Sequence, residues 1–104
     1  MKKIINGKRY DTETATEIGS WDNGLSNSDF DNCSETLYKT KLGNYFLHGE
    51  GGAMSSYSVN VGNNGRGGSS EIIPMSKQEA LEWCEIRGLA DEIEEEFADT
   101  IKDA

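Results

Sequence analysis

Hydrophobic positions recur every four residues near the end of the chain, and this interval is typical of one face of an amphipathic helix. The positions are Leu89, Ile93, Phe97 and Ile101. Their spacing predicts a helix from Leu89 to about Lys102 whose apolar stripe packs against the rest of the domain. A break is expected at Gly88, because glycine commonly ends a helix.

A second helix is predicted directly before this break. Ser76 and Glu79 have the spacing of a capping box, in which each side chain accepts a hydrogen bond from the other residue's backbone. The helix that they open is expected to run to about Arg87. The chain from 77 to 101 is therefore expected to be mainly helical.

Two β-hairpins are predicted in the first half of the chain. Asn6-Gly7 lies between two short runs and suits a type I′ turn, so residues 2–11 are expected to form a tight hairpin. Thr36–Thr40 and Tyr45–His48 are rich in β-branched and aromatic residues and flank a turn with Gly43. They are expected to form the central hairpin.

The segments between these elements have weaker patterns. Asp11 is expected to cap a short helix over 12–18 that stops at Gly19, and residues 21–34 are expected to form a loop. Residues 49–70 contain seven glycines, and 57–61 within them suit either a short strand or a helical turn. Residues 71–73 are expected to form a last strand, at a sheet edge because Pro74 follows.

These elements predict an α+β fold in one domain, with a small antiparallel sheet of hairpins packed against C-terminal helices. The chain has 104 residues, of which 35% are hydrophobic, so its core is expected to depend on aromatic side chains. Residues 1–75 are expected to be mainly β with loops, and residues 76–104 to form an acidic helical segment.

Charge changes the picture more than any other bulk property. The net charge is −9, and residues 77–104 hold ten acidic and three basic side chains, a net charge of −7. This balance argues against direct binding to nucleic acid or to an anionic membrane, and it permits attraction to a basic protein surface. The alternative is that the charge only keeps the protein soluble.

Like charges four residues apart repel on a helix, so local stability does not explain the acidic pattern. Two interpretations are open: a solvated helix face, and an acidic patch for a basic partner. The predicted partner-binding residues are Asp91, Glu92, Glu94, Glu95, Glu96 and Asp99.

The candidates for catalysis are His48 and Glu50, which lie beside a glycine-rich turn and could act as a general acid and base. The favoured interpretation is a histidine at a strand end, because no nucleophile accompanies it. No catalytic residue is therefore assigned, and a small enzyme using His48 and Glu50 stays the alternative.

No metal or cofactor site is predicted. The glycines of 49–53 lack the lysine of a phosphate-binding loop, and Asp22, Asp29 and Asp31 lack the spacing of a calcium loop. Arg66 is a weaker candidate for anchoring a carboxylate or phosphate of a partner, and a simple loop residue is the alternative.

The two cysteines, Cys33 and Cys84, lie far apart in the sequence. A disulfide between them is possible, and the reduced state is favoured in a cytoplasmic protein. No apolar run is long enough for a membrane helix, and the basic first residues are not followed by the apolar stretch of a signal peptide. A cytoplasmic protein is expected, as a monomer or small homo-oligomer.

Three segments resemble a family of small proteins carried by bacterial phages and mobile elements. The opening 3–15, the hairpin with its glycine turn (35–41 and 46–55) and the closing segment 72–83 carry the resemblance. The chain is similar to the anti-CRISPR inhibitors among such proteins. The resemblance implies binding to a CRISPR–Cas effector protein or complex. The acidic surface would then block the effector's nucleic-acid binding. A phage accessory protein with no defence role is a further alternative.

Overall fold

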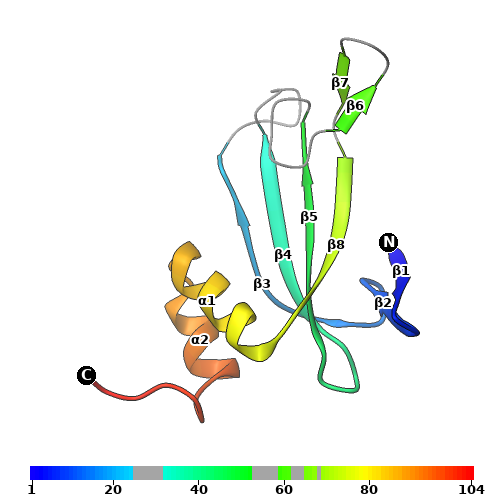
Figure 1. Ribbon diagram of the computed structural model, residues 1–104. Coiled ribbons are helices and arrows are strands. Elements are labelled where there is room, and N and C mark those ends of the chain that lie inside the picture. The colour runs from blue at the N-terminus through cyan, green and yellow to red at the C-terminus, as the bar shows by residue number, and fades with distance from the viewer. Residues whose placement is uncertain (25–31, 53–58, 62–64, 68) are drawn as a thin grey trace.

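The computed structural model describes residues 1–24, 32–52, 59–61, 65–67 and 69–104. Its centre is a four-stranded antiparallel sheet in the order β3-β4-β5-β8, followed in the chain by two helices (Figure 1). The strands are β3 (Thr16–Asp22), β4 (Cys33–Lys39), β5 (Tyr45–Gly51) and β8 (Ser69–Met75). The predicted α+β fold of hairpins and C-terminal helices is confirmed.

Both predicted hairpins are present. The strands β1 (Lys2–Ile5) and β2 (Lys8–Asp11) pair around Asn6 and Gly7, whose φ angles of 52° and 77° fit the predicted type I′ turn. The central hairpin of β4 and β5 extends further than predicted at both outer ends. β8 lies at a sheet edge, as predicted, and pairs with β5.

The helix predicted over 12–18 is wrong, and so is the loop predicted to begin at Trp21. The backbone carbonyl oxygen of Asp11 accepts hydrogen bonds from the backbone nitrogens of Thr14 and Ala15. These bonds close one turn before β3 begins. The β-branched threonines disfavour a helix in this segment. Gly19 does not end a helix. It lies in β3, where a β-carbon would stand 3.0 Å from Leu89 Cδ1, so glycine allows close packing.

The loop prediction is wrong at both of its ends. Trp21 and Asp22 belong to β3, and Cys33 and Ser34 belong to β4, where the two strands pair. The middle of that predicted loop, 25–31, lies outside the described residues. Of the glycine-rich segment, two three-residue strands are described, β6 (Val59–Val61) and β7 (Gly65–Gly67), which pair with each other. The strand alternative at 57–61 is confirmed over Val59–Val61.

The helices begin as predicted but the second ends early. α1 (Lys77–Arg87) has the complete capping box of Ser76 and Glu79, and Gly88 ends it at a φ of 72°. α2 (Ala90–Glu96) stops six residues short of the predicted end. The carbonyl oxygen of Phe97 accepts hydrogen bonds from the backbone nitrogens of Thr100 and Ile101, which close a final turn. Ile101 is 40% exposed, so the apolar stripe ends at Phe97.

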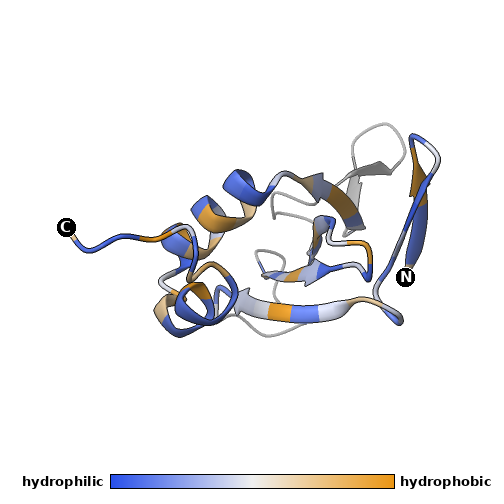
Figure 2. Cartoon of the chain, turned by 90° about the horizontal axis from the view of Figure 1, so that it is seen from below, coloured by the Kyte–Doolittle hydropathy of each residue, from blue (hydrophilic) through white to orange (hydrophobic). Residues whose placement is uncertain are grey.

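The sheet has a separate hydrophobic core on each face. The helices cover one face, where Leu37, Leu47 and Phe97 are buried with Trp83. Leu89 and Ile93 are only half-buried against this core. Their predicted burial is therefore partial. The β1–β2 hairpin lies at the other side of the sheet, away from the helices, in both views (Figures 1 and 2).

Candidate functional site

The outer face of the two helices is the candidate site. On α1 the exposed side chains include Glu82, Glu85 and Ile86, and Ile86 is 77% exposed. The opposite side of α1 carries Ala80, Leu81, Trp83 and Cys84 into the core. The helical period therefore places acidic side chains outward, with one apolar residue beside them.

The six predicted binding acids do not share one environment. Asp91, Glu94 and Glu95 are exposed on α2 and form no ion pair with any described residue. Glu92 is half-buried, with its side chain against Gly19 of β3. The patch that a partner could contact is thus defined here as Glu82, Glu85, Asp91, Glu94 and Glu95, and is called the acidic patch below.

Glu96 serves the fold instead of the acidic patch. Its carboxylate accepts hydrogen bonds from Lys39 Nζ at 2.7 Å and from the Tyr45 hydroxyl at 2.5 Å. Burial raises the pKa of Glu96, but these two hydrogen bonds and the charges of Lys39 and Lys77 outweigh it and leave that pKa lowered. Burial and the Glu96 carboxylate raise the pKa of Tyr45 to about 12. Glu96 therefore ties α2 to the central hairpin.

Asp99 is the sixth predicted residue, and it is also partnered. Lys77 Nζ lies 3.2 Å from Asp99 Oδ2, although both side chains are largely exposed. This ion pair lowers the pKa of Asp99, first through the hydrogen bond from Lys77 and then through its charge. Lys39 and Lys77 both line a hollow of about 340 Å³ beside Tyr45, and both are paired with an acidic residue.

Neutralising Glu96 should weaken the fold in a pH-dependent way. We expect Glu96→Gln to lower the free energy of unfolding at pH 7 by about 1.5–3 kcal/mol, the usual value of hydrogen bonds to a charged group. Because the folded-state pKa is lowered, this stability is present above the ordinary glutamate pKa and is lost as the pH falls below it. Urea unfolding at pH 7 and pH 3 measures it, and an equal difference at both would contradict this role.

A buried charge cluster holds α1 on the sheet. Glu35 of β4 is 8% exposed and accepts hydrogen bonds from Trp83 Nε1 at 3.0 Å and from Arg87 Nη2 at 2.5 Å. The Arg87 guanidinium stacks on the Trp21 ring, 3.5 Å from its centre. Sequence reasoning missed this cluster, because its members are separated by up to 66 positions in the chain. The cluster fixes the direction in which the acidic patch points.

Cys84 is a free thiol, so the Cys33–Cys84 disulfide left open by the sequence is not formed. Cys84 is fully buried in the helix-side core, and Cys33 is half-buried on β4. Burial, with smaller contributions from Glu92 and Glu85, raises the pKa of the Cys84 thiol to about 11.

Selective alkylation should follow from this difference. With iodoacetamide at pH 8 we expect Cys84 to stay unmodified in the folded protein, because burial blocks access and suppresses the reactive thiolate. Unfolding in urea should expose it to complete modification, and mass spectrometry of tryptic peptides measures both states. Alkylation of Cys84 at equal rates in both states would contradict its placement in the core.

His48 and Glu50 lie two residues apart on β5, so their side chains share the sheet face opposite the helices. Ser34 Oγ donates to Glu50 Oε1 at 3.4 Å across the β4–β5 pair. Glu50 is exposed and His48 is half-buried. Between them no hydrogen bond is formed, and the enzyme alternative gains no geometric support from the described residues.

The remaining weak candidates divide by whether they are described. The side chain of Arg66 and both Asp29 and Asp31 lie outside the described residues, whereas Asp22 is exposed at the end of β3. Among the described residues, no group of three histidine, cysteine or acidic side chains is placed to hold a metal ion. No described helix is long and apolar enough to cross a bilayer.

Comparison with protein-family models, curated proteins and solved structures found no match for this chain.

Proposed function

We propose that this protein is an inhibitor that binds a CRISPR–Cas effector and covers a basic surface that the effector uses for nucleic acid. The acidic patch makes the contact, without a cofactor and without a chemical step. The resemblance of segments 3–15, 35–41, 46–55 and 72–83 to small phage and mobile-element proteins directs the proposal to this class of partner.

One observation carries the proposal: the acidic patch is exposed and is not neutralised from within the described part of the protein. The three described ion pairs use Glu35, Glu96 and Asp99 instead. Asp91 and Glu95 stand one helical turn apart, where like charges cost a few tenths of a kcal/mol. A cationic partner surface removes this repulsion and releases the mobile ions around both surfaces.

The composition of the acidic patch suits a protein channel that normally holds nucleic acid. Guide-loaded effectors hold their heteroduplex in a positively charged channel and recognise it through its backbone. Carboxylates on two adjoining helices present negative charge to the same lysines and arginines. Ile86 adds the desolvated contact that is usual at the centre of a protein interface.

The experiment uses purified guide-loaded effectors of single-protein and multisubunit types. We expect the protein to reduce binding of a labelled target DNA by one of them, with a 1:1 complex detected by native mass spectrometry. A protein that binds none of the panel, or that binds one while leaving its target binding unchanged, would overturn the proposed function.

The enzyme alternative is tested by one substitution. His48→Ala should leave inhibition unchanged within about twofold, because His48 lies on the sheet face opposite the helices and well-separated sites act independently. Target-DNA binding and thermal melting of the variant are measured together. Loss of inhibition in a variant that melts like the native protein would favour catalysis by His48 and Glu50.

The third candidate, a phage accessory protein without a defence role, differs in its partner and not in its surface. The acidic patch would then contact another basic protein. Inhibition of no effector, together with salt-sensitive binding to a phage or host protein, favours this candidate.

A further inference from the structure

The β1–β2 hairpin has the opposite charge to the helices. Its exposed cations are Lys2, Lys3, Lys8 and Arg9, and all four lie within eight positions of one another. The only acidic residue of the two strands is Asp11. Its Oδ1 accepts a hydrogen bond from the backbone nitrogen of Glu13. None of the four cations forms an ion pair with a described residue.

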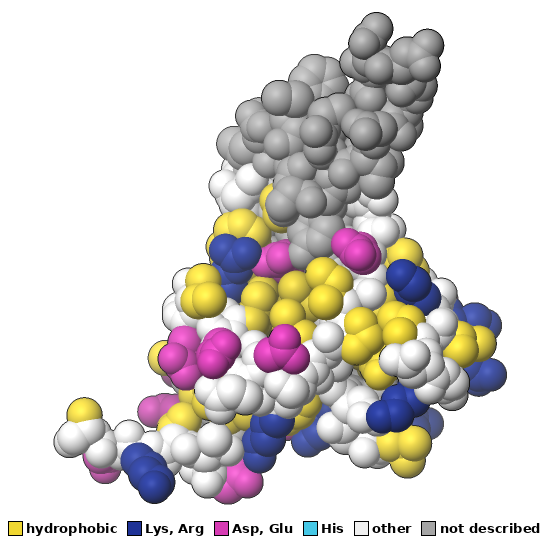
Figure 3. All heavy atoms as spheres, in the orientation of Figure 1, with side chains coloured by type: hydrophobic (Ala, Val, Ile, Leu, Met, Phe, Trp, Pro, Cys, Tyr) yellow, Lys and Arg dark blue, Asp and Glu magenta, His cyan; other side chains and the backbone are white. Residues whose placement is uncertain are grey.

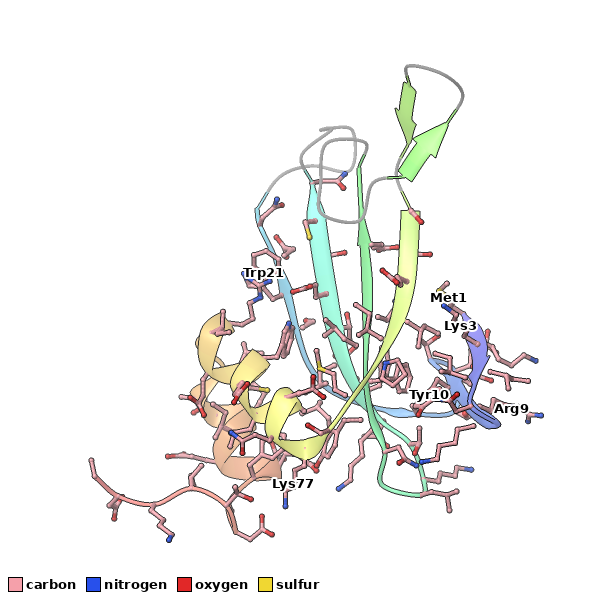
Figure 4. All side chains as sticks on the ribbon, in the orientation of Figure 1. Met1, Lys3, Arg9, Tyr10, Trp21 and Lys77 are labelled. Carbon is pink, nitrogen blue, oxygen red and sulfur yellow. The ribbon has the colours of Figure 1, made fainter. Side chains whose placement is uncertain are left out.

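The hairpin is held firmly against the sheet. Tyr10 is 6% exposed, and its ring meets Phe46 edge-on with 5.5 Å between the ring centres. Ile5 packs against the same cluster. Strand alternation places Lys3 on the side of Tyr10, and Lys2 and Arg9 on the outer side, so cations border both faces of the ribbon (Figure 4).

The two charged ends act independently of each other. The helices and the hairpin lie on opposite flanks of the sheet, and Figure 3 shows basic side chains gathered on the hairpin flank. Exposed charges that lie further apart than the Debye length, about 8–10 Å at physiological salt, are largely screened from each other. The net charge of −9 is therefore the sum of a basic hairpin and an acidic pair of helices, and a partner can contact either of them separately.

The composition of the hairpin favours phosphates over a protein surface as its target. Nucleic-acid interfaces are polar and strongly positive, and lysine and arginine are the side chains that most often contact their phosphates. The only aromatic residue of the hairpin, Tyr10, is buried. Ile4 is 64% exposed and Met1 47% exposed, which is little apolar area beside four cations.

We propose that the β1–β2 hairpin binds the phosphodiester backbone of a nucleic acid through Lys2, Lys3, Lys8 and Arg9. In the complex of the proposed function, on which this inference rests, that nucleic acid is the guide RNA of the effector. The acidic patch then lies on the effector's basic surface while the hairpin reaches the RNA beside it. The inference departs from the expectation, drawn from net charge alone, that the protein does not contact nucleic acid directly.

The test needs no effector, so its failure is distinct from failure of the proposed function. Fluorescence anisotropy measures binding of a labelled single-stranded RNA of about 20 nucleotides at low salt. Four neutralised phosphates predict a slope of log affinity against log salt of about −2.8. Replacing all four cations with glutamine should lower affinity at least tenfold.

Matched single variants separate a hairpin contact from a simple change of net charge. Arg9→Gln should weaken RNA binding and flatten the salt slope, whereas Lys102→Gln, with the same loss of charge near the other end, should do neither. No binding by the native protein at low salt would overturn the proposal, and so would equal binding by the fourfold variant. Displacement of the RNA by a poly-glutamate peptide at equal charge would assign the hairpin to an acidic protein instead.

Discussion

Truncation of Phe97 to alanine should destabilise the protein by about 3–5 kcal/mol, the usual cost for a fully buried phenylalanine. Phe97 is 0% exposed and stands at the end of α2, with its ring 5.5 Å from that of Tyr45. The change removes packing from the helix-side core and leaves a cavity. It also frees the end of α2, the helix that carries Asp91, Glu94 and Glu95 of the acidic patch.

Urea unfolding followed by circular dichroism measures the loss. Ile101→Ala is the matched control, because Ile101 belongs to the same four-residue series but is exposed, and its change is expected to stay within about 0.5 kcal/mol. A small domain typically has only about 5–15 kcal/mol of stability, so Phe97→Ala should remove a large share of it. A loss below about 1 kcal/mol would contradict the burial of Phe97.

Reversal of Asp91, Glu94 and Glu95 to lysine should weaken effector binding about 100-fold while the fold survives. Each exposed charge pair contributes about 0.5 kcal/mol, and each reversal replaces an attraction with a repulsion of similar size. Three reversals therefore cost about 3 kcal/mol, and each 1.4 kcal/mol is a factor of ten. The three side chains are exposed, so packing is unaffected.

The choice of residues in this variant comes from the structure. Glu96 is left in place because it holds Lys39 and Tyr45, and Asp99 because it pairs with Lys77. Reversing Glu96 would confound loss of contact with loss of the α2 anchor. Its depressed pKa has the same origin as its structural role.

A control with the same net charge separates the acidic patch from bulk charge. Glu13, Glu17 and Glu71 are also exposed but lie outside the two helices. Reversing these three to lysine changes the net charge by the same amount. Binding should fall about 100-fold in the first variant only. An equal fall in both would show that total charge, and not the acidic patch, attracts the partner.

Local signals in the sequence predicted the fold well where they act over a few residues. The Asn6-Gly7 turn, the Ser76–Glu79 capping box and the Gly88 stop were each placed correctly. Each depends on backbone conformation or on a bond within one turn. Such features need no knowledge of distant packing.

The errors arose where tertiary contacts decide. Residues 16–22 were predicted as the end of a helix, its stop at Gly19 and the start of a loop, but their pairing with β4 and the packing of Gly19 against Leu89 make them a strand. The four-residue period predicted α2 to continue to about Lys102. Beyond Phe97 the chain meets no further apolar surface, so Ile101 is exposed and the helix is not maintained.

The candidate site was predicted only in outline. The concentration of acids in the last 28 residues was evident, but their division into contact and structural groups was not. Glu95 and Glu96 are adjacent residues of the same type. Glu96 is structural because it accepts hydrogen bonds from Lys39 and Tyr45, which precede it by more than 50 positions. The basic hairpin was not predicted as a site, because the net charge of the chain does not show where its basic and acidic residues lie.

The most direct test of the central claim is the affinity of the native protein for a purified guide-loaded effector across a salt series from about 50 mM to 500 mM. Exposed charge contacts are screened over this range, because the Debye length falls well below 10 Å. We predict that affinity falls steeply with salt for the native protein and for the Glu13, Glu17 and Glu71 control. For the Asp91, Glu94 and Glu95 reversal we predict weak, nearly flat binding. Affinity that is constant or rises with salt in the native protein would contradict an acidic contact.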